Sequence, residues 1–156
     1  MYVWGGNDEG QLGQNQGSAQ LNGKSSPTQL EAGSSRKWSK VVGGYTSYFI
    51  GIKNDQTMYT WGNQTGSYGN LGHNQTNGSR SQPTQIPGTN WKDCSASAMM
   101  CSAVKTDGTL WSWGYNHQGQ LAHNDIVFRS SPTQVGTDTK WKNTNNPLLG
   151  NLLANQ

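Results

Sequence analysis

The chain has 156 residues, of which 31% are hydrophobic and 12% charged, and its net charge is +3 at pH 7. This length predicts one domain, and the weak, dispersed charge gives no strong signal for nucleic-acid binding. No stretch approaches the apolar length of a membrane span, and we expect no ordinary signal peptide before the first motif. Abundant Gly, Asn and Ser disfavour helices, while seven Trp and six Tyr supply apolar surface. The composition therefore predicts an all-β chain with a thin aromatic core.

A Trp-Gly pair recurs three times and sets the organisation of the sequence. The copies are Trp4-Gly5, Trp61-Gly62 and Trp113-Gly114, so successive copies lie 57 and 52 residues apart. A short apolar segment precedes each pair. A polar loop follows it and ends on an apolar anchor, which is Leu12, Leu71 or Leu121. A repeat of this length predicts an array of equal supersecondary units.

Two further landmarks keep the same phase along the chain. A Pro-Thr-Gln segment begins at Pro27, Pro83 and Pro132, and a lone tryptophan follows it at Trp38, Trp91 and Trp141. These landmarks predict three repeats over residues 1–142, approximately 1–38, 39–91 and 92–142. A leucine-containing tail, 143–156, follows the repeats, and we interpret it as a degenerate closing strand.

The unit between the second and third Trp-Gly pairs predicts four short strands. They cover residues 83–86, 91–95, 100–105 and 109–113. A proline suits the edge or the first position of a strand. The dipeptide Asp107-Gly108 predicts a hairpin with a type I′ turn, in which both central residues have positive φ. Four antiparallel strands per repeat describe a β-propeller blade better than a β-helix, whose repeats are usually much shorter.

Three linked motifs resemble the repeat of the regulator of chromosome condensation family. They are Trp-Gly-x-Asn-x-x-Gly-Gln-Leu-Gly, a Pro-Thr segment, and Lys-x-Asp-Gly before the next Trp-Gly, over roughly residues 1–142. The resemblance implies a seven-bladed β-propeller, yet only three Trp-Gly copies are present. An open arc leaves strand edges bare. We therefore expect a partial propeller that belongs to a longer product or a ring completed by other chains.

The phase of the chain ends suggests how such a ring closes. Residues 2–4 are interpreted as the last strand of a blade, and residues 148–153 as a strand that pairs with them. Pairing between two chains predicts six blades with two-fold symmetry.

The variable polar loops supply the candidate binding residues, because loops on a rigid scaffold are where binding usually resides. The candidates are Asn15, His73, Asn74, Arg80, His123, Asn124 and Arg129. His73 and His123 occupy equivalent loop positions, and Gln14 occupies that position in the first repeat. Solvated histidines are therefore a better interpretation than metal ligands.

No arrangement of residues predicts catalysis. Asp55 and Asp107 are explained as hairpin-turn residues, and Cys94 and Cys101 as small buried side chains. No recurring pair of carboxylates, nucleophile–histidine grouping, zinc spacing or phosphate loop is found. We predict no catalytic residue, no metal site and no cofactor.

The prediction for function is a non-enzymatic structural or binding module. Its expected partners are protein, by self-association or through another virion or propeller subunit, and glycans. The regular polar repeats resemble short family members from bacteriophages and environmental bacteria, which suggests a virion tail, fibre or decoration protein. The alternative implied by the resemblance is a small-GTPase regulator or chromatin-binding propeller, which needs a full ring, an acidic face and a basic tail. The sequence leaves the ligand, the host and the assembly open.

Overall fold

The computed structural model describes residues 1–16, 23–31, 35, 37–145 and 153–156. The described residues form β-strands and one 3₁₀ turn, η1 (Thr65–Ser67), without an α-helix, and none of them forms a helix capable of crossing a membrane. The strands are β1 (Tyr2–Gly5), β2 (Lys24–Gln29), β3 (Trp38–Gly44), β4 (Tyr48–Lys53), β5 (Met58–Gly62), β6 (Arg80–Gln85), β7 (Trp91–Ala96), β8 (Met100–Lys105), β9 (Leu110–Gly114), β10 (Arg129–Gln134), β11 (Asn143–Asn145) and β12 (Leu153–Asn155).

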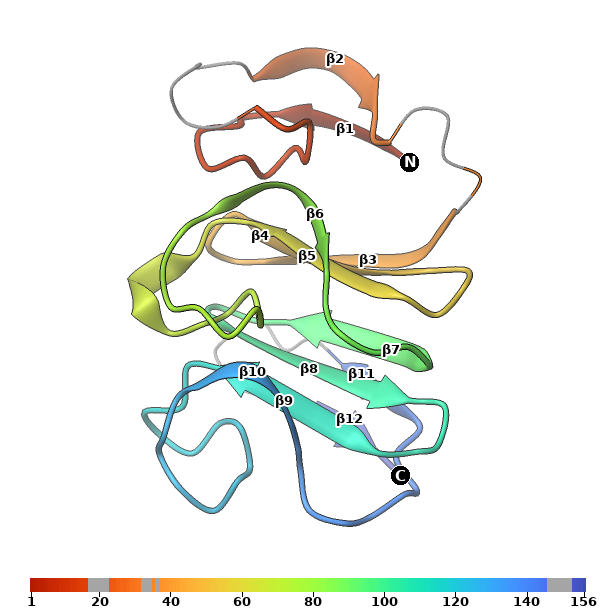
Figure 1. Cartoon of the computed structure of the whole chain (residues 1–156), viewed down its shortest axis with the longest axis vertical. Helices are drawn as coiled ribbons and strands as arrows, with labels where there is room; N and C mark the ends of the chain where they lie inside the picture. Colours follow the sequence, from red (N-terminus) through yellow and green to blue (C-terminus); the bar gives the residue numbers. More distant parts are fainter. Residues whose placement is uncertain (17–22, 32–34, 36, 146–152) are drawn as a thin grey trace.

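The strands form two four-stranded antiparallel sheets, β3-β4-β5-β6 and β7-β8-β9-β10, and two two-stranded sheets, β1-β2 and β11-β12. Figure 1 shows β1-β2, β3–β6 and β7–β10 following one another along the long axis. The predicted all-β architecture, with four antiparallel strands in a sheet, is confirmed. The division into repeats at 38 and 91 stays a prediction, and the four-stranded sheets run over residues 38–85 and 91–134.

The grouping of strands differs from the predicted unit. The strand that contains Pro83 is β6, which pairs with β5 and completes the preceding sheet. Likewise β1 is equivalent to β5 and β9, the third strands of their sheets, because each carries the Trp-Gly pair and pairs with a Pro-Thr-Gln strand. The interpretation of residues 2–4 as a last strand is therefore wrong. The proline-containing strands β6 and β10 lie at sheet edges, as predicted.

The hairpin at Asp107-Gly108 is confirmed, but its turn is not type I′. The Gly108 amide donates to the Lys105 carbonyl at 3.0 Å, and positive φ falls on Gly108 (81°), not on Asp107. This pattern is a turn followed by one left-handed residue, the usual form of a longer hairpin loop. A Cβ at Gly108 would lie 1.9 Å from the Thr139 carbonyl oxygen, so glycine also allows a close backbone approach.

Apolar side chains fill the spaces between successive sheets. One cluster joins β3–β6 to β7–β10 and includes Tyr48, Ile50, Leu71, Trp91 and Trp113. A smaller cluster joins β1-β2 to β3–β6 around Leu30, Tyr59 and Trp61. Cys94 and Cys101 are fully buried free thiols in the larger cluster, as predicted. Burial raises the pKa of Cys94 to about 12 and also raises that of Cys101, so both stay protonated.

The last two strands repeat the geometry of β7 and β8. In β11-β12, Asn143 pairs with Asn155 and Thr144 with Ala154. The equivalent pairs of β7-β8 are Asp93 with Val104 and Cys94 with Ala103. The predicted closing strand over residues 148–153 lies largely outside the described residues, and the described residues 153–155 pair with β11.

Candidate functional site

The glycine of each Trp-Gly pair turns the chain from its strand into the polar loop. Gly5, Gly62 and Gly114 have φ of 102°, 96° and 105°, a region that strongly favours glycine. A Cβ at Gly62 or Gly114 would lie 2.4 Å from the carbonyl oxygen of Ser47 or Met99. Glycine is therefore required for both the conformation and the close packing at the start of the second and third loops.

A buried asparagine holds the first and third loops in shape. Asn7 and Asn116 are both fully buried. Asn7 Oδ1 accepts a hydrogen bond from Leu12 N at 2.9 Å, and Asn116 Oδ1 accepts one from Leu121 N at 2.8 Å. Sequence reasoning overlooked these asparagines, although the Asn of the repeated motif was the available signal.

The first and second loops are hydrogen-bonded to the following sheet. Trp61 Nε1 donates to the Gln11 carbonyl at 3.0 Å, and Asn15 N donates to the Ser81 carbonyl at 2.7 Å. The next boundary repeats this pattern with Asn74 N and the Ser130 carbonyl, also at 2.7 Å. The predicted binding residues Asn15 and Asn74 thus join their loops to the next sheet through backbone hydrogen bonds, and both residues are exposed.

His73 and His123 are bonded to strand hydroxyls rather than freely solvated. Thr60 Oγ1 donates to the Leu71 carbonyl at 2.6 Å, so it accepts from His73 Nε2 at 2.9 Å. Ser112 makes the same pair of bonds, donating to the Leu121 carbonyl and accepting from His123 Nε2 at 3.1 Å. Burial and the charge of Arg80 lower the pKa of His73 to about 4, so its ring is neutral.

The remaining predicted loop residues have mostly local partners. Arg80 donates to Gln75 Oε1 at 2.5 Å, and Arg129 forms an ion pair with Asp125 at 2.6 Å. Asn124 is exposed with φ of 58°. These side chains define polar loop surfaces but do not converge on one pocket.

A lysine between two aromatic rings occurs at both four-stranded sheets, and we call this arrangement the lysine–aromatic site. Lys53 Nζ lies 4.9 Å and 4.3 Å from the ring centroids of Trp38 and Tyr59. Lys105 Nζ lies 4.7 Å and 4.2 Å from those of Trp91 and Trp111. Sequence reasoning treated these lysines as solvated strand ends, because the rings come from other strands.

Asp93 is a second residue that sequence reasoning overlooked. Its carboxylate forms an ion pair with Lys40 of β3 at 2.5 Å and accepts the Thr144 backbone N–H at 2.7 Å. One side chain on β7 therefore joins three successive sheets.

Within the part of the chain that the structure describes, no three His, Cys, Asp or Glu residues gather as a metal site. The arrangement offers aromatic surfaces, backbone edges and charged side chains suited to binding. Fold and site together define a scaffold built from β-propeller blades.

The regulator of chromosome condensation (RCC1) repeat model matches residues 1–50, 55–104 and 107–143, and the chain belongs to this repeat family. It is 32% identical over 137 residues to the ultraviolet-B receptor UVR8 of Arabidopsis thaliana, covering 85% of this chain and 29% of the receptor. It is 31% identical over 124 residues to the human E3 ubiquitin-protein ligase HERC2, covering 78% of this chain and 2% of the ligase. The chain thus spans less than a third of these relatives.

Solved structures share the fold. Human WBSCR16 aligns with a TM-score of 0.75 and 21% identity, covering 92% of this chain and 37% of WBSCR16. Prp20p from Saccharomyces cerevisiae, whose structure is described with its binding to Gsp1p and histones, aligns with a TM-score of 0.72 and 17% identity, covering 87% of this chain and 34% of Prp20p. These structures therefore share the fold of this chain, and the binding to Gsp1p and histones is described for Prp20p.

Proposed function

We propose that the chain is a non-enzymatic, protein-binding propeller segment that completes a blade with a second copy of itself. The observation that carries this proposal is the match between its two half-blades. Sheet β11-β12 has the register of β7-β8, the first two strands of a blade. Sheet β1-β2 has the register of β9-β10, the last two strands.

The register specifies the contact between the copies. In the complete blade, β9 lies beside β8 with Trp111 opposite Ala103. Adding β1 of a second copy to β12 in the same way places Tyr2 opposite Ala154. Backbone hydrogen bonds of this kind bind added strands strongly at exposed sheet edges. Two copies then form six blades, within the usual range of about four to eight.

Trp4 provides the side chain for this contact. Trp4 is 62% exposed, whereas its counterparts Trp61 and Trp113 are 1% and 0% exposed. Trp4 of one copy would face the loop around Gln120 of the other copy, as Trp113 faces Asn70 within one chain. One difference is Ala122, which replaces the glycine found at Gly72, where a Cβ would lie 2.7 Å from Trp113 Nε1. The indole of Trp4 therefore sits slightly farther from the loop.

A cavity beside β1 supports the same arrangement. It has a volume of about 230 Å³, and its lining includes Val3, Val41 and Phe49. At the boundary between the two four-stranded sheets, the equivalent space is filled, because β3 and β4 of one sheet pack against β7 of the next. The partner's β11-β12 is expected to fill this cavity.

The experiment is light scattering on the purified chain across a concentration series. We expect twice the chain mass of 17.0 kDa and a shift to monomer for Trp4→Ser or after removal of residues 147–156. Tyr45→Ser is the matched control, because Tyr45 is also an exposed aromatic residue, at 86%, but lies in the β3–β4 loop. A monomer at all concentrations, or a dimer unaffected by Trp4→Ser, contradicts self-completion and leaves another propeller segment as the partner.

The narrower roles remain predictions from sequence. A virion role and glycan binding through the polar loops are tested by electron microscopy of virions labelled with an antibody against the chain and by a glycan array. For the alternative of a small-GTPase regulator or chromatin binder, a nucleotide-exchange assay and a histone-binding assay are the tests. The weak net charge of +3 favours neither DNA nor a strongly charged partner.

A further inference from the structure

The two lysine–aromatic sites have the same framework. In each, the backbone N–H of the lysine donates to the carbonyl of the threonine just before the next strand, at 2.9 Å for Lys53 and 3.0 Å for Lys105. The two rings beside the lysine meet edge to face, at 5.5 Å for Trp38 and Tyr59 and 6.0 Å for Trp91 and Trp111. The sites are therefore equivalent by backbone and by side-chain geometry.

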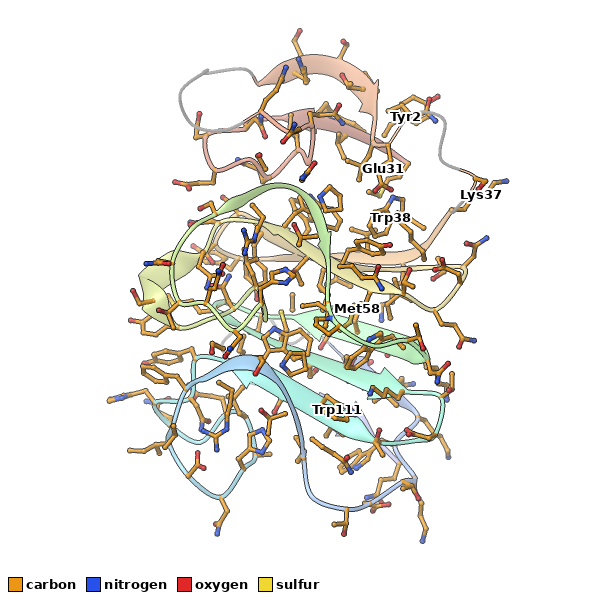
Figure 2. The ribbon with its side chains drawn as sticks, viewed as in Figure 1. Tyr2, Glu31, Lys37, Trp38, Met58 and Trp111 are labelled. Carbon is orange, nitrogen blue, oxygen red and sulfur yellow. The ribbon has the colours of Figure 1, made fainter. Side chains whose placement is uncertain are left out.

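A carboxylate from the preceding sheet closes the first site. Glu31 Oε2 lies 2.8 Å from Lys53 Nζ, and the lysine is only 5% exposed. Figure 2 shows Glu31 projecting toward Trp38 across the boundary between β2 and β3. The ammonium group thus has aromatic walls and a charged partner, which together offset the cost of its burial.

The second site lacks that carboxylate. Leu30 and Ile86 occupy matched positions, since their amides donate to Met1 and Met58 carbonyls at the starts of equivalent strands. The residue after Ile86 is Pro87, which therefore stands in place of Glu31. Among the described residues, no carboxylate lies within ion-pair distance of Lys105.

An open pocket occupies the space beside Lys105. Its volume is about 330 Å³, and Asn74, Gln85, Pro87, Trp91, Lys105 and Trp111 contribute to its lining. The nearby Asp107 carboxylate accepts hydrogen bonds from Thr109 at 3.0 Å and 2.7 Å. Residues Trp111 and Lys105 are both half-buried rather than enclosed, so a ligand in this pocket has access to them.

We propose that this pocket binds a carboxylate, supplied by an aspartate or glutamate side chain of a protein partner. Glu31 shows within the same chain that a glutamate on a peptide backbone can pair with the lysine of the equivalent site, at 2.8 Å from Lys53 Nζ. The side-chain amides of Asn74 and Gln85, which contribute to the lining, suit the peptide groups that flank such a residue. A carboxylate in a partly dehydrated pocket also gains more from an ammonium than it does in open water.

The test is an NMR titration of the full chain with N-acetyl-glutamate amide, following the indole N–H signals of Trp91 and Trp111. We expect saturable shifts, with binding at least about tenfold weaker for Lys105→Met. Lys105→Arg keeps the positive charge and is expected to restore binding. Lys92→Met removes an exposed lysine from β7 and is expected to leave the titration unchanged. Thermal unfolding of each variant establishes that it is folded.

Two further probes separate the sources of the carboxylate. N-acetyl-glutamine amide has the same shape without the charge, and equal binding of this probe overturns the proposal. Saturable shifts with glucuronate but not with the peptide probe overturn the proposal of a protein partner and indicate a sugar acid as the ligand. The absence of shifts with every probe at about 50 mM also overturns the proposal. The pocket lies within one chain, so its failure is distinguishable from failure of self-completion, which light scattering measures.

Discussion

The indole nitrogen of Trp113 donates a hydrogen bond to the backbone carbonyl of Asn70 at 3.0 Å, across the boundary between two sheets. Trp61 and Gln11 form the same bond at the preceding boundary. In each case, a loop of one sheet is joined to the third strand of the next. The tryptophan of the repeated motif thus fixes the spacing of neighbouring blades as well as filling the core between them.

Replacing Trp113 with phenylalanine is expected to lower the free energy of unfolding by about 3 kcal/mol. The change leaves a space in the core, and it leaves the buried Asn70 carbonyl with only the weak thiol donor of Cys101, at 3.5 Å. Urea denaturation followed by circular dichroism measures the change. The control is Trp111→Phe on the same strand, where the indole is half-buried and bonds locally to Thr109. Equal losses for the two variants would show that the bond between blades adds no stability.

Gly69 and Gly119 provide a matched pair for measuring how tightly the loops pack. Their φ angles are 75° and 77°, but a Cβ would lie 2.4 Å from Ser130 Cα at Gly69 and 3.9 Å from the Asp125 carbonyl oxygen at Gly119. Gly119→Ala is expected to cost about 1 kcal/mol through its backbone conformation. Gly69→Ala is expected to cost about 2 kcal/mol more. Thermal unfolding distinguishes them, and similar melting temperatures would contradict the contact at Ser130.

The hydroxyl–imidazole pairs are expected to be energetically coupled. Thr60→Val alone is expected to cost about 2 kcal/mol, since it unpairs both the Leu71 carbonyl and the His73 N–H. Combined with His73→Gln, the variant reproduces the Val3 and Gln14 combination that the first repeat already contains. A double-mutant cycle by urea denaturation is expected to give a coupling of about 1 kcal/mol. Additive losses would mean that the bond between Thr60 and His73 contributes nothing.

Acidification is expected to destabilise the chain before its carboxylates titrate. Burial and Arg80 lower the pKa of His73 in the folded chain to about 4, whereas in the unfolded chain it has its ordinary value of about 6.5. Between these two pH values the unfolded chain therefore binds a proton at His73 that the folded chain does not. Stability is therefore complete above the higher of these values and falls as the pH approaches the lower.

Between about pH 7 and pH 5 we expect a loss of about 1 kcal/mol from His73, after allowing for solvent around its half-buried ring. Urea denaturation at the two pH values measures it, with His73→Gln as the control that removes this part of the slope. His123, whose pKa is lowered by burial and by Arg129, acts in the same direction. If the free energy of unfolding of His73→Gln falls with pH as steeply as that of the original chain, His73 is not the cause of the loss.

Much of the fold could be predicted because the repeat marks every blade with the same local signals. The Trp-Gly pair, the Pro-Thr-Gln segment and the Lys-x-Asp segments at Lys53 and Lys105 each specify a turn or a strand through residues next to one another in sequence. The predicted strands over 91–95 and 100–105 closely match β7 and β8. The grouping of strands could not be predicted in the same way, because the long loop before Pro83 hides its pairing with β5.

The sequence by itself determined the repeat, its β-strands and the residues that turn the chain, because these depend on local backbone preferences and on a period in the order of residues. Only the tertiary structure decided what the loop residues and the lysines contact. Lys53 forms an ion pair with Glu31, whereas Lys105 has no such carboxylate among the described residues. The facing residue comes from the preceding sheet, across a boundary that local patterns do not describe. The open pocket at Lys105 is lined by residues of two successive sheets, and Pro87 contributes to it at the position where the preceding repeat has Glu31.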